Sequence, residues 1–304
     1  MSRIVSHRSA LHDGGFPLRL RIARVRAGLL SCLGLLGVPL VAAAQRVDAA
    51  GPARHETWFE RSDRAKAEQP HWITPLATTT PRLEQEFRYD VLWQQPSAAA
   101  PSTETIGNTK GLELIPWDRL EVIAAVPPYL LHHSATVADG FGDFQLLLKL
   151  RLVAAPAARG DYILTAFLGS TFPTGSGTNG QPSSVVTPTL AYGKGFGAVD
   201  LQGTAGAAIP ATDAAASARA YMWNNTFQCH LARVVWPEVE VNATWFRGGK
   251  NDGKEQVFVT PGFVVGRLAL AQRVGLTLGA GLQLPVSSFH TSEHNIIASV
   301  RVPF

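Results

Sequence analysis

The sequence is poor in cysteine and in charged residues. Two cysteines in 304 residues exclude a small scaffold held together by disulfides. Charged residues make up 16% of the chain, well below the roughly one quarter that is usual for soluble domains. A mean hydropathy of only +0.06 excludes a helical membrane protein with several spans, because each span needs an apolar run of about 20 residues. An apolar content of 46% and a net charge of only +4 also argue against a disordered chain.

The first 44 residues have the three parts of a secretory signal peptide. Six arginines precede an apolar stretch, Ala27–Val41, which is followed by the small residues Ala42-Ala43-Ala44. We therefore predict cleavage after Ala44 and export of the chain. Two other interpretations stay open, namely an uncleaved anchor over the 18 residues 27–44 and a lipoprotein signal that ends at Cys32.

Removal of residues 1–44 changes the charge of the chain. It takes away six basic residues and one acid, Asp13, so that 27 − 6 = 21 basic and 23 − 1 = 22 acidic residues remain, a net charge of −1. The pI of 9.3 therefore reflects the signal peptide, and we expect no nucleic-acid partner. Cys32 is also removed, which leaves Cys229 without an intramolecular disulfide partner.

Alternation of polar and apolar residues with a period of two begins at residue 82 and continues to the C-terminus. Residues 45–81 lack this period, and we interpret them as a periplasmic N-terminal segment that is too short to fold as a plug domain. Each alternating segment predicts a strand with one polar and one apolar face. Twelve segments of this kind are found, at residues 82–93, 111–115, 120–126, 143–152, 162–172, 186–192, 198–209, 219–231, 238–245, 256–267, 276–284 and 296–304.

Alternation alone also fits a soluble β-sandwich, and three further features favour a membrane barrel. The polar faces include small residues such as Gly279 and Gly281, whereas the apolar faces are uniformly compatible with lipid. Long polar connections, such as 94–110 and 173–185, alternate with short ones, such as 116–119 and 193–197, as in outer-membrane barrels. Aromatic residues lie near strand ends, as at a membrane interface, and they include Trp93, Trp117, Trp236, Trp245 and Phe304.

These features predict an all-β fold over residues 82–304, a closed antiparallel transmembrane β-barrel of about 12 strands (10–14). A spanning sheet must close on itself, because hydrocarbon offers no partner for free backbone groups. We therefore place the protein in the outer membrane of a Gram-negative-type bacterium, in contact with outer-membrane lipid. A barrel of this size is either filled by side chains or wide enough for a small solute.

Charged side chains and one histidine on the polar faces are predicted to line the lumen. Acids and bases are mixed there, so we expect no strong ion selectivity. Cys229 falls on the opposite, lipid-facing side of its strand. The predicted lumen-lining residues are Glu84, Glu86, Arg88, Asp143, Lys149, Arg151, His230, Glu238, Glu240 and Arg301.

No motif predicts catalysis, a cofactor or a metal centre. His290 and His294 are four residues apart, but they lie in a predicted external loop without a helical pattern. Ser288, His290, His294 and Asn295 supply the residue types of an outer-membrane hydrolase, without a motif that fixes their geometry. We therefore expect a channel or transporter and no enzyme. A closed structural or adhesive barrel and an outer-membrane hydrolase remain as alternatives.

Three short motifs carry a resemblance to a known family. They are Ala138-Asp139-Gly140-Phe141-Gly142-Asp143, Phe172-Pro173-Thr174-Gly175-Ser176-Gly177, and the segment from Thr187 to Gly197. In this order and spacing they resemble the outer-membrane β-barrels named for the MetA pathway of phenol degradation, over roughly residues 75–304. The resemblance implies passage of small aromatic compounds. The strand that ends at Phe304 is similar to the C-terminal signal read by barrel-assembly machinery, which implies that partner.

Overall fold

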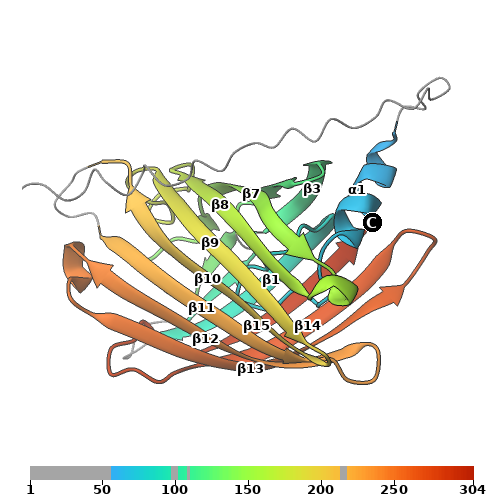
Figure 1. The fold of residues 1–304 in the computed structure, drawn as a ribbon. Helices are drawn as coiled ribbons and strands as arrows, with labels where there is room; N and C mark the ends of the chain where they lie inside the picture. The colour runs from blue at the N-terminus through green and yellow to red at the C-terminus, as the bar shows by residue number, and fades with distance from the viewer. Residues whose placement is uncertain (1–55, 97–101, 108–109, 213–217) are drawn as a thin grey trace, which may run out of the picture. The chain divides into compact units, whose positions relative to one another are not determined.

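The computed structural model describes residues 56–96, 102–107, 110–212 and 218–304. The predicted signal peptide, residues 1–44, lies outside them. Within these ranges one α-helix, α1 (Trp58–Ala67), precedes fifteen antiparallel strands that close into a barrel, because β15 pairs with β1 (Figure 1). The strands are β1 (Glu86–Pro96), β2 (Thr103–Ile106), β3 (Gly111–Trp117), β4 (Leu120–Ala125), β5 (Tyr129–His132), β6 (Gly140–Phe141), β7 (Phe144–Ala155), β8 (Tyr162–Phe172), β9 (Val185–Phe196), β10 (Val199–Pro210), β11 (Arg219–Cys229), β12 (Val235–Arg247), β13 (Glu255–Ala269), β14 (Gly275–Pro285) and β15 (Ser292–Pro303).

The fifteen strands occupy twelve positions in the barrel wall. β2 and β3 pair in succession with the same strand, β1, so together they fill one position. In the same way, β4 and β5 share one position, and β6 and β7 share the next. β4 pairs with β3 and β7, whereas β5 pairs with β2 and β6. The predicted closed barrel of about 12 strands is confirmed.

The three interrupted positions break at a common level of the wall. Pro127 and Pro128 separate β4 from β5, and proline cannot donate to the strand ladder. The amide of Gly142, between β6 and β7, donates to the carbonyl oxygen of Pro128 at 2.7 Å. The sequence predicts long external connections at these breaks, because proline and glycine residues are typical of loops.

The strands are polar on the inside of the barrel and apolar on the outside. Arg88, Lys149 and Glu240 are completely buried on the inner face. Large apolar side chains, such as Trp223, Phe263 and Ile296, are about half exposed on the outer face. Because each apolar side chain left in water forgoes about 1.5–3 kcal/mol, this outer surface is suited to lipid and unsuited to water.

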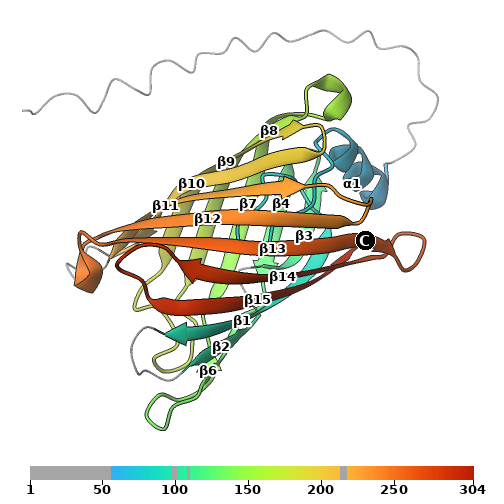
Figure 2. The same ribbon diagram turned by 90° about the horizontal axis from the view of Figure 1, so that it is seen from below.

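Long and short connections lie at opposite ends of the barrel. One end carries short turns, at residues 118–119, 156–161, 197–198, 230–234 and 270–274. The other end carries connections that are longer on average, and the described ones lie at residues 133–139, 173–184, 248–254 and 286–291. We call these the short-turn end and the long-loop end. Helix α1 and the C-terminus lie at the short-turn end (Figure 2). In the described part of the chain, no helix is both long enough and apolar enough to cross a membrane.

The residues just before the barrel are ordered by contacts that sequence periodicity does not reveal. Thr57 caps α1 by accepting a hydrogen bond from the amide of Glu60, whose carboxylate accepts one from the amide of Thr57 at 2.8 Å. This reciprocal pair is a capping box. Residues 69–85 then run inside the barrel, where they supply Trp72, Ile73, Leu76 and Leu83 to the buried apolar clusters. The sequence predicts a periplasmic segment over residues 45–81, whereas residues 69–81 of it lie inside the barrel in the structure.

Candidate functional site

The lumen contains residues 69–85, which we call the inserted segment. The segment enters from the short-turn end after α1, turns inside the barrel and returns to the start of β1 (Figures 1 and 2). Its side chains and backbone contact inward groups from β1, β7, β8, β10, β12 and β15. Contacts to strands on all sides of the barrel place the segment within the lumen.

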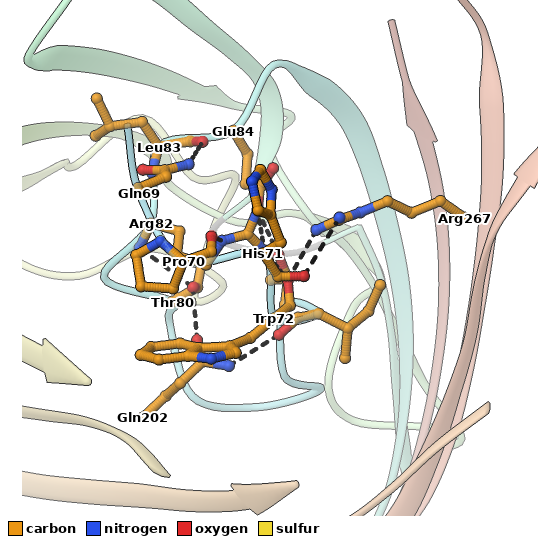
Figure 3. A network of polar contacts seen from close by, with 12 residues as sticks. Gln69, Pro70, His71, Trp72, Thr80, Arg82, Leu83, Glu84, Gln202 and Arg267 are labelled. Carbon is orange, nitrogen blue, oxygen red and sulfur yellow. Dashed lines mark hydrogen bonds and ion pairs between the residues drawn. The ribbon is translucent and has the colours of Figure 1, made fainter. Parts of the chain in front are cut away.

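The base of the inserted segment is closed by its own side chains (Figure 3). Gln69 and Leu83 exchange two hydrogen bonds, of 2.7 and 2.9 Å, which join the two ends of the segment. Arg82 donates to the carbonyl oxygens of Pro70, at 2.7 Å, and of Trp72, and it forms an ion pair with Glu84 at 2.9 Å. These contacts hold a loop that has no regular secondary structure.

Carboxylates of β12 accept the free amides at the tip of the inserted segment. Glu238 accepts from the amide of Leu76 at 3.0 Å, and Glu240 accepts from the amides of Ala77 and Thr78 at 2.7 and 2.6 Å. A buried backbone amide without an acceptor is costly, so these contacts stabilise the loop. The barrel wall thus replaces the partners that a strand or helix would give this loop.

Two inward arginines bind the carbonyl oxygens of the same turn. Arg301 donates to the carbonyl oxygens of Thr74 and Pro75, the latter at 2.9 Å, and Arg88 donates to those of Pro75, at 3.1 Å, and Leu76. Both guanidinium groups are completely buried. Because a buried carbonyl without a donor costs about 1–3 kcal/mol, these arginines fix the depth of the segment in the lumen.

Glycines on the inner wall make room for two apolar side chains of the segment. A Cβ atom at Gly279 would lie 2.5 Å from Leu76 Cδ2, and one at Gly262 would lie 2.6 Å from Leu76 Cδ1. A Cβ atom at Gly193 would lie 2.5 Å from the ring of Trp72. The wall therefore has two glycine sockets, one for Leu76 and one for Trp72.

Helix α1 is tied to the turns at the short-turn end. Arg273 donates two hydrogen bonds to Asp63, at 2.8 and 2.9 Å, and Arg61 donates to the carbonyl oxygen of Pro116 at 2.7 Å. The hydrogen bond from Arg273 lowers the pKa of the Asp63 carboxyl below its ordinary value. Asp63 and Arg273 are both solvent-exposed. Their ion pair therefore contributes little to the stability of α1 against the barrel.

The half of the lumen nearest the long-loop end is hollow. A cavity of about 1330 Å³ lies there, with Thr79 of the inserted segment among its lining residues. We call this cavity the vestibule. Its lining includes the polar residues Thr187, Thr189 and Thr204 and the apolar residues Leu130, Leu146, Leu147 and Phe167. The site is therefore a mixed polar and apolar chamber that is closed below by the inserted segment.

The structure places most of the predicted lumen-lining residues on buried positions around the inserted segment. Glu86, Arg88, Lys149, Arg151, Glu238, Glu240 and Arg301 are buried members of strands. Glu84 is buried too, but it belongs to the inserted segment. Asp143, between β6 and β7, accepts hydrogen bonds from the amides of Gly175 and Gln181 at 2.8 and 2.7 Å, so it fastens a loop at the vestibule.

Two predicted positions differ from the structure. His230 follows the end of β11, is exposed, and stacks on Trp236 with ring centroids 4.0 Å apart, so it lies in a turn at the short-turn end and not in the lumen. Trp236 was expected at the membrane interface, but it is only 8% exposed and packs with Trp72 and Leu76. The reason is that Trp236 shares the inward parity of Glu238 and Glu240 on β12.

The remaining predicted interface residues lie near strand ends. Trp93 and Trp117 are exposed on β1 and β3, while Trp245 and Phe304 are half-buried. The amide of Phe304 donates to the carbonyl oxygen of Gln85 at 3.1 Å, which connects the C-terminus to the base of the inserted segment. The aromatic positions are consistent with a band at each end of the outer surface.

The residues considered for hydrolysis hold the loop between β14 and β15. His290 Nδ1 lies 3.2 Å from the carbonyl oxygen of Ser287, and its Nε2 lies 3.7 Å from the Glu293 carboxylate. Asn295 donates to Gln283 at 2.6 Å on the inner face of β15. These contacts shape the loop, and none of them activates a hydroxyl group.

Sequence analysis missed the residues that decide how the lumen is filled. Trp72, Leu76 and Gln202 were not singled out, because their partners lie far away in the chain. Lys110 was not singled out either, because it belongs to a stretch that was predicted to be a loop. One signal was present, namely the small inward residues Gly279 and Gly281. In a barrel of about 12 strands, a patch of glycine on the inner face leaves space that another part of the chain must fill.

Comparisons with known proteins give a structural likeness only. No family model matches the chain, and no curated protein matches it. The chain is similar to the COG4313 outer membrane channel from Pseudomonas putida F1, with a TM-score of 0.51, 16% sequence identity, and coverage of 76% of this chain and 98% of that one. It is also similar to the NanC porin, with a TM-score of 0.48, 7% identity, and coverage of 71% and 98%. The first likeness supports the barrel fold alone, and the resemblance to the MetA-pathway family stays a prediction.

Proposed function

We propose that the protein is an outer-membrane channel for small solutes, with aromatic compounds among them, in which the inserted segment forms the constriction. The observation that carries the proposal is a chamber of about 1330 Å³ inside a closed barrel, with the tip of the inserted segment at its floor. A lining that combines hydroxyl and amide groups with leucines suits a small molecule with both polar and apolar parts. We take the long-loop end as external and the short-turn end as periplasmic, as in known outer-membrane barrels.

Passage requires a shift of the inserted segment. Its polar contacts are made by side chains of the wall, such as Glu240 and Arg301. When the segment moves, water can take its place as the hydrogen-bond partner of these groups. Its apolar contacts are concentrated in the two glycine sockets for Trp72 and Leu76. A segment held in this way exchanges between seated and displaced positions without disrupting any strand pairing.

Permeation of reconstituted liposomes tests the proposal. We expect liposomes with the wild-type protein to take up arabinose and benzenesulfonate faster than empty liposomes do. The variant W72A/L76A, which empties both sockets, is expected to raise the rate several-fold. Insertion of both proteins is checked by the heat-dependent gel mobility that folded barrels show.

One observation favours a second candidate, a closed structural or adhesive barrel. The inserted segment is fully integrated into the hydrogen bonding of the lumen, as a permanent filling would be. If both proteins insert and neither passes either solute, the structural function replaces the channel. Hydrolysis of lipid or peptide that is lost in S288A or H290A would instead favour the enzyme.

A further inference from the structure

The vestibule contains a buried basic group that has no hydrogen-bond partner among the described residues. Lys110 lies at the break between β2 and β3, is only 5% exposed, and is among the residues that line the vestibule. Within the described ranges, no hydrogen-bond or ion-pair partner meets its Nζ. Burial of an ammonium group that makes no hydrogen bond to an anion is unfavourable. The position is therefore suited to an anion that enters from the vestibule.

The other charged groups of the vestibule lining do not compete for this role. Among the described lining residues, the charged ones are Lys110, Asp143 and Lys250. Asp143 is engaged by the amides of Gly175 and Gln181. Lys250 lies in the 3₁₀ turn of the loop between β12 and β13 and is solvent-exposed, so its charge is hydrated. Among the described lining residues, Lys110 is the buried cation whose charged group has no hydrogen-bond partner.

Apolar residues at the strand breaks line the vestibule together with Lys110. The strand breaks meet here: a Cβ atom at Gly107 would lie 3.4 Å from Pro128 Cα, and one at Gly142 would lie 2.9 Å from Pro128 Cγ and 3.1 Å from Leu130 Cδ1. Leu146 and Leu147 of β7 also line the chamber. The absence of side chains at the two glycines brings Pro128 and Leu130 close to the break that carries Lys110.

We infer that the vestibule binds small hydrophobic monocarboxylates, with the carboxylate at Lys110 and the apolar body against Pro128, Leu130 and Leu147. This inference rests on the proposed function, because such a ligand would be a solute on its way through the channel. A single ammonium group beside an apolar wall matches one carboxylate better than a phosphate or a dicarboxylate, whose additional charge would remain buried and unpaired.

An internal alternative is a pair between Lys110 and a carboxylate of the wall. The charged groups around Lys110 are Arg88, Asp90, Glu113 and Arg301. Asp90 is paired with Arg88 at 2.9 Å, and Arg301 binds backbone carbonyls. Glu113 Oε1, in contrast, is buried without a partner in the described part of the chain, and Glu113 faces Glu86 across β1 and β3. Glu113 is therefore the competitor that the experiment must address.

Equilibrium binding to the full-length protein in detergent tests the inference, with 3-phenylpropionate and 3-phenylpropan-1-ol as matched probes. The two probes share a ring and a chain length and differ in the carboxylate. At pH 6 the carboxylate is ionised, and a partly desolvated lysine is still protonated. We expect the wild-type protein to bind the acid at least tenfold more tightly than the alcohol. Equal affinities would overturn the inference without any variant.

Three variants locate the effect. K110Q is expected to weaken binding of the acid at least tenfold and to leave binding of the alcohol within twofold. K250Q, the exposed lysine of the same chamber, is expected to change neither. E113Q removes the internal competitor and is expected to leave acid binding equal or tighter. A K110Q protein that weakens both probes equally, or neither, would overturn the inference, as would loss of acid binding in E113Q.

The binding and permeation experiments can each disprove one proposal without disproving the other. If liposomes take up neither arabinose nor benzenesulfonate but the acid preference depends on Lys110, the channel is wrong and the carboxylate site stands. If liposomes are permeable but the acid has no preference over the alcohol, the site is wrong and the channel stands.

Discussion

At the scale of single residues, the inner glycines determine whether the inserted segment is seated. Glycine is usually unfavourable within a strand, since it has no side chain to pack. Here Gly262, Gly279 and Gly281 lie against Leu76, so the missing side chains are replaced by one from the inserted segment. The socket makes the position of the segment specific, and a single methyl group in the socket would disturb it.

The variant G279V is expected to displace Leu76 and to raise arabinose permeation several-fold, because a Cβ atom there would lie 2.5 Å from Leu76 Cδ2. Overpacking of this kind destabilises by about 1–3 kcal/mol. The double variant L76A/G279V shortens the side chain of the segment and enlarges that of the wall, so the socket contact is partly restored. Its permeation is therefore expected to fall back toward the wild-type rate. G169A serves as the control, since its Cβ atom would lie 3.3 Å from that of Thr187 and away from the segment. Permeation of G279V at the wild-type rate would contradict the account.

The ion pair between Asp63 and Arg273 is expected to fasten α1 in a pH-dependent way. The pKa of Asp63 is lowered in the folded protein, mainly by the hydrogen bond from Arg273. A lowered pKa means that the stabilisation is present above the ordinary value of 3.8 and is lost as the pH falls through the folded value. D63N is therefore expected to speed proteolysis within α1 modestly at pH 7, by an amount that corresponds to less than about 1 kcal/mol. K66Q, which alters a longer contact of 3.9 Å to Asp63, is the control. Equal proteolysis of all three proteins would show that the pair does not fasten α1.

At the scale of elements, sequence reasoning succeeds where one local pattern decides the structure. The alternation in residues 276–284 and 296–304 predicts β14 and β15, because each strand has one face toward the lumen and the other toward the outside. It fails at β2 and β5, where proline and glycine interrupt the pattern although the pairing continues beyond the break. It also misses α1, although Thr57 and Glu60 carry the signature of a capping box.

The inserted segment lies beyond local reasoning for a different reason. The amide of Leu76 finds its partner at Glu238, and that of Thr78 finds its partner at Glu240, both 162 residues further along the chain. No period or composition within residues 69–85 encodes such contacts. The predicted lumen residues supply half of the site, and the segment that they hold supplies the other half.

The last strand is expected to control assembly, because β15 closes the barrel against β1. We propose that barrel-assembly machinery recognises this strand through Phe304. Deletion of Phe304 is expected to lower the amount of protein in outer-membrane fractions several-fold, while P303A, which keeps the terminal aromatic residue, is expected to have little effect. Fractionation with immunoblotting measures both. Undiminished levels without Phe304 would argue against this recognition.

At the scale of the whole molecule, the protein inverts the usual distribution of polarity. Its inner surface buries many charged groups, and these groups are satisfied largely by one another and by the backbone of the inserted segment. Its outer surface exposes aromatic and aliphatic side chains from almost every strand. We propose that the barrel supplies a passage and that the inserted segment restricts it, so solutes are expected to cross only when the segment moves.

A reversible tether tests this claim most directly. L76C/G279C in a C229A background places two thiols at the contact where Leu76 Cδ2 lies 2.5 Å from the Cβ position of residue 279, and oxidation joins them where their Cβ atoms approach to ~3.5–4.5 Å. In planar bilayers, we expect the oxidised protein to conduct less than the same protein after reduction, by at least tenfold, with C229A alone unaffected by the redox change. Equal conductance of the tethered and reduced proteins would show that solutes pass without movement of the inserted segment, and would contradict the account.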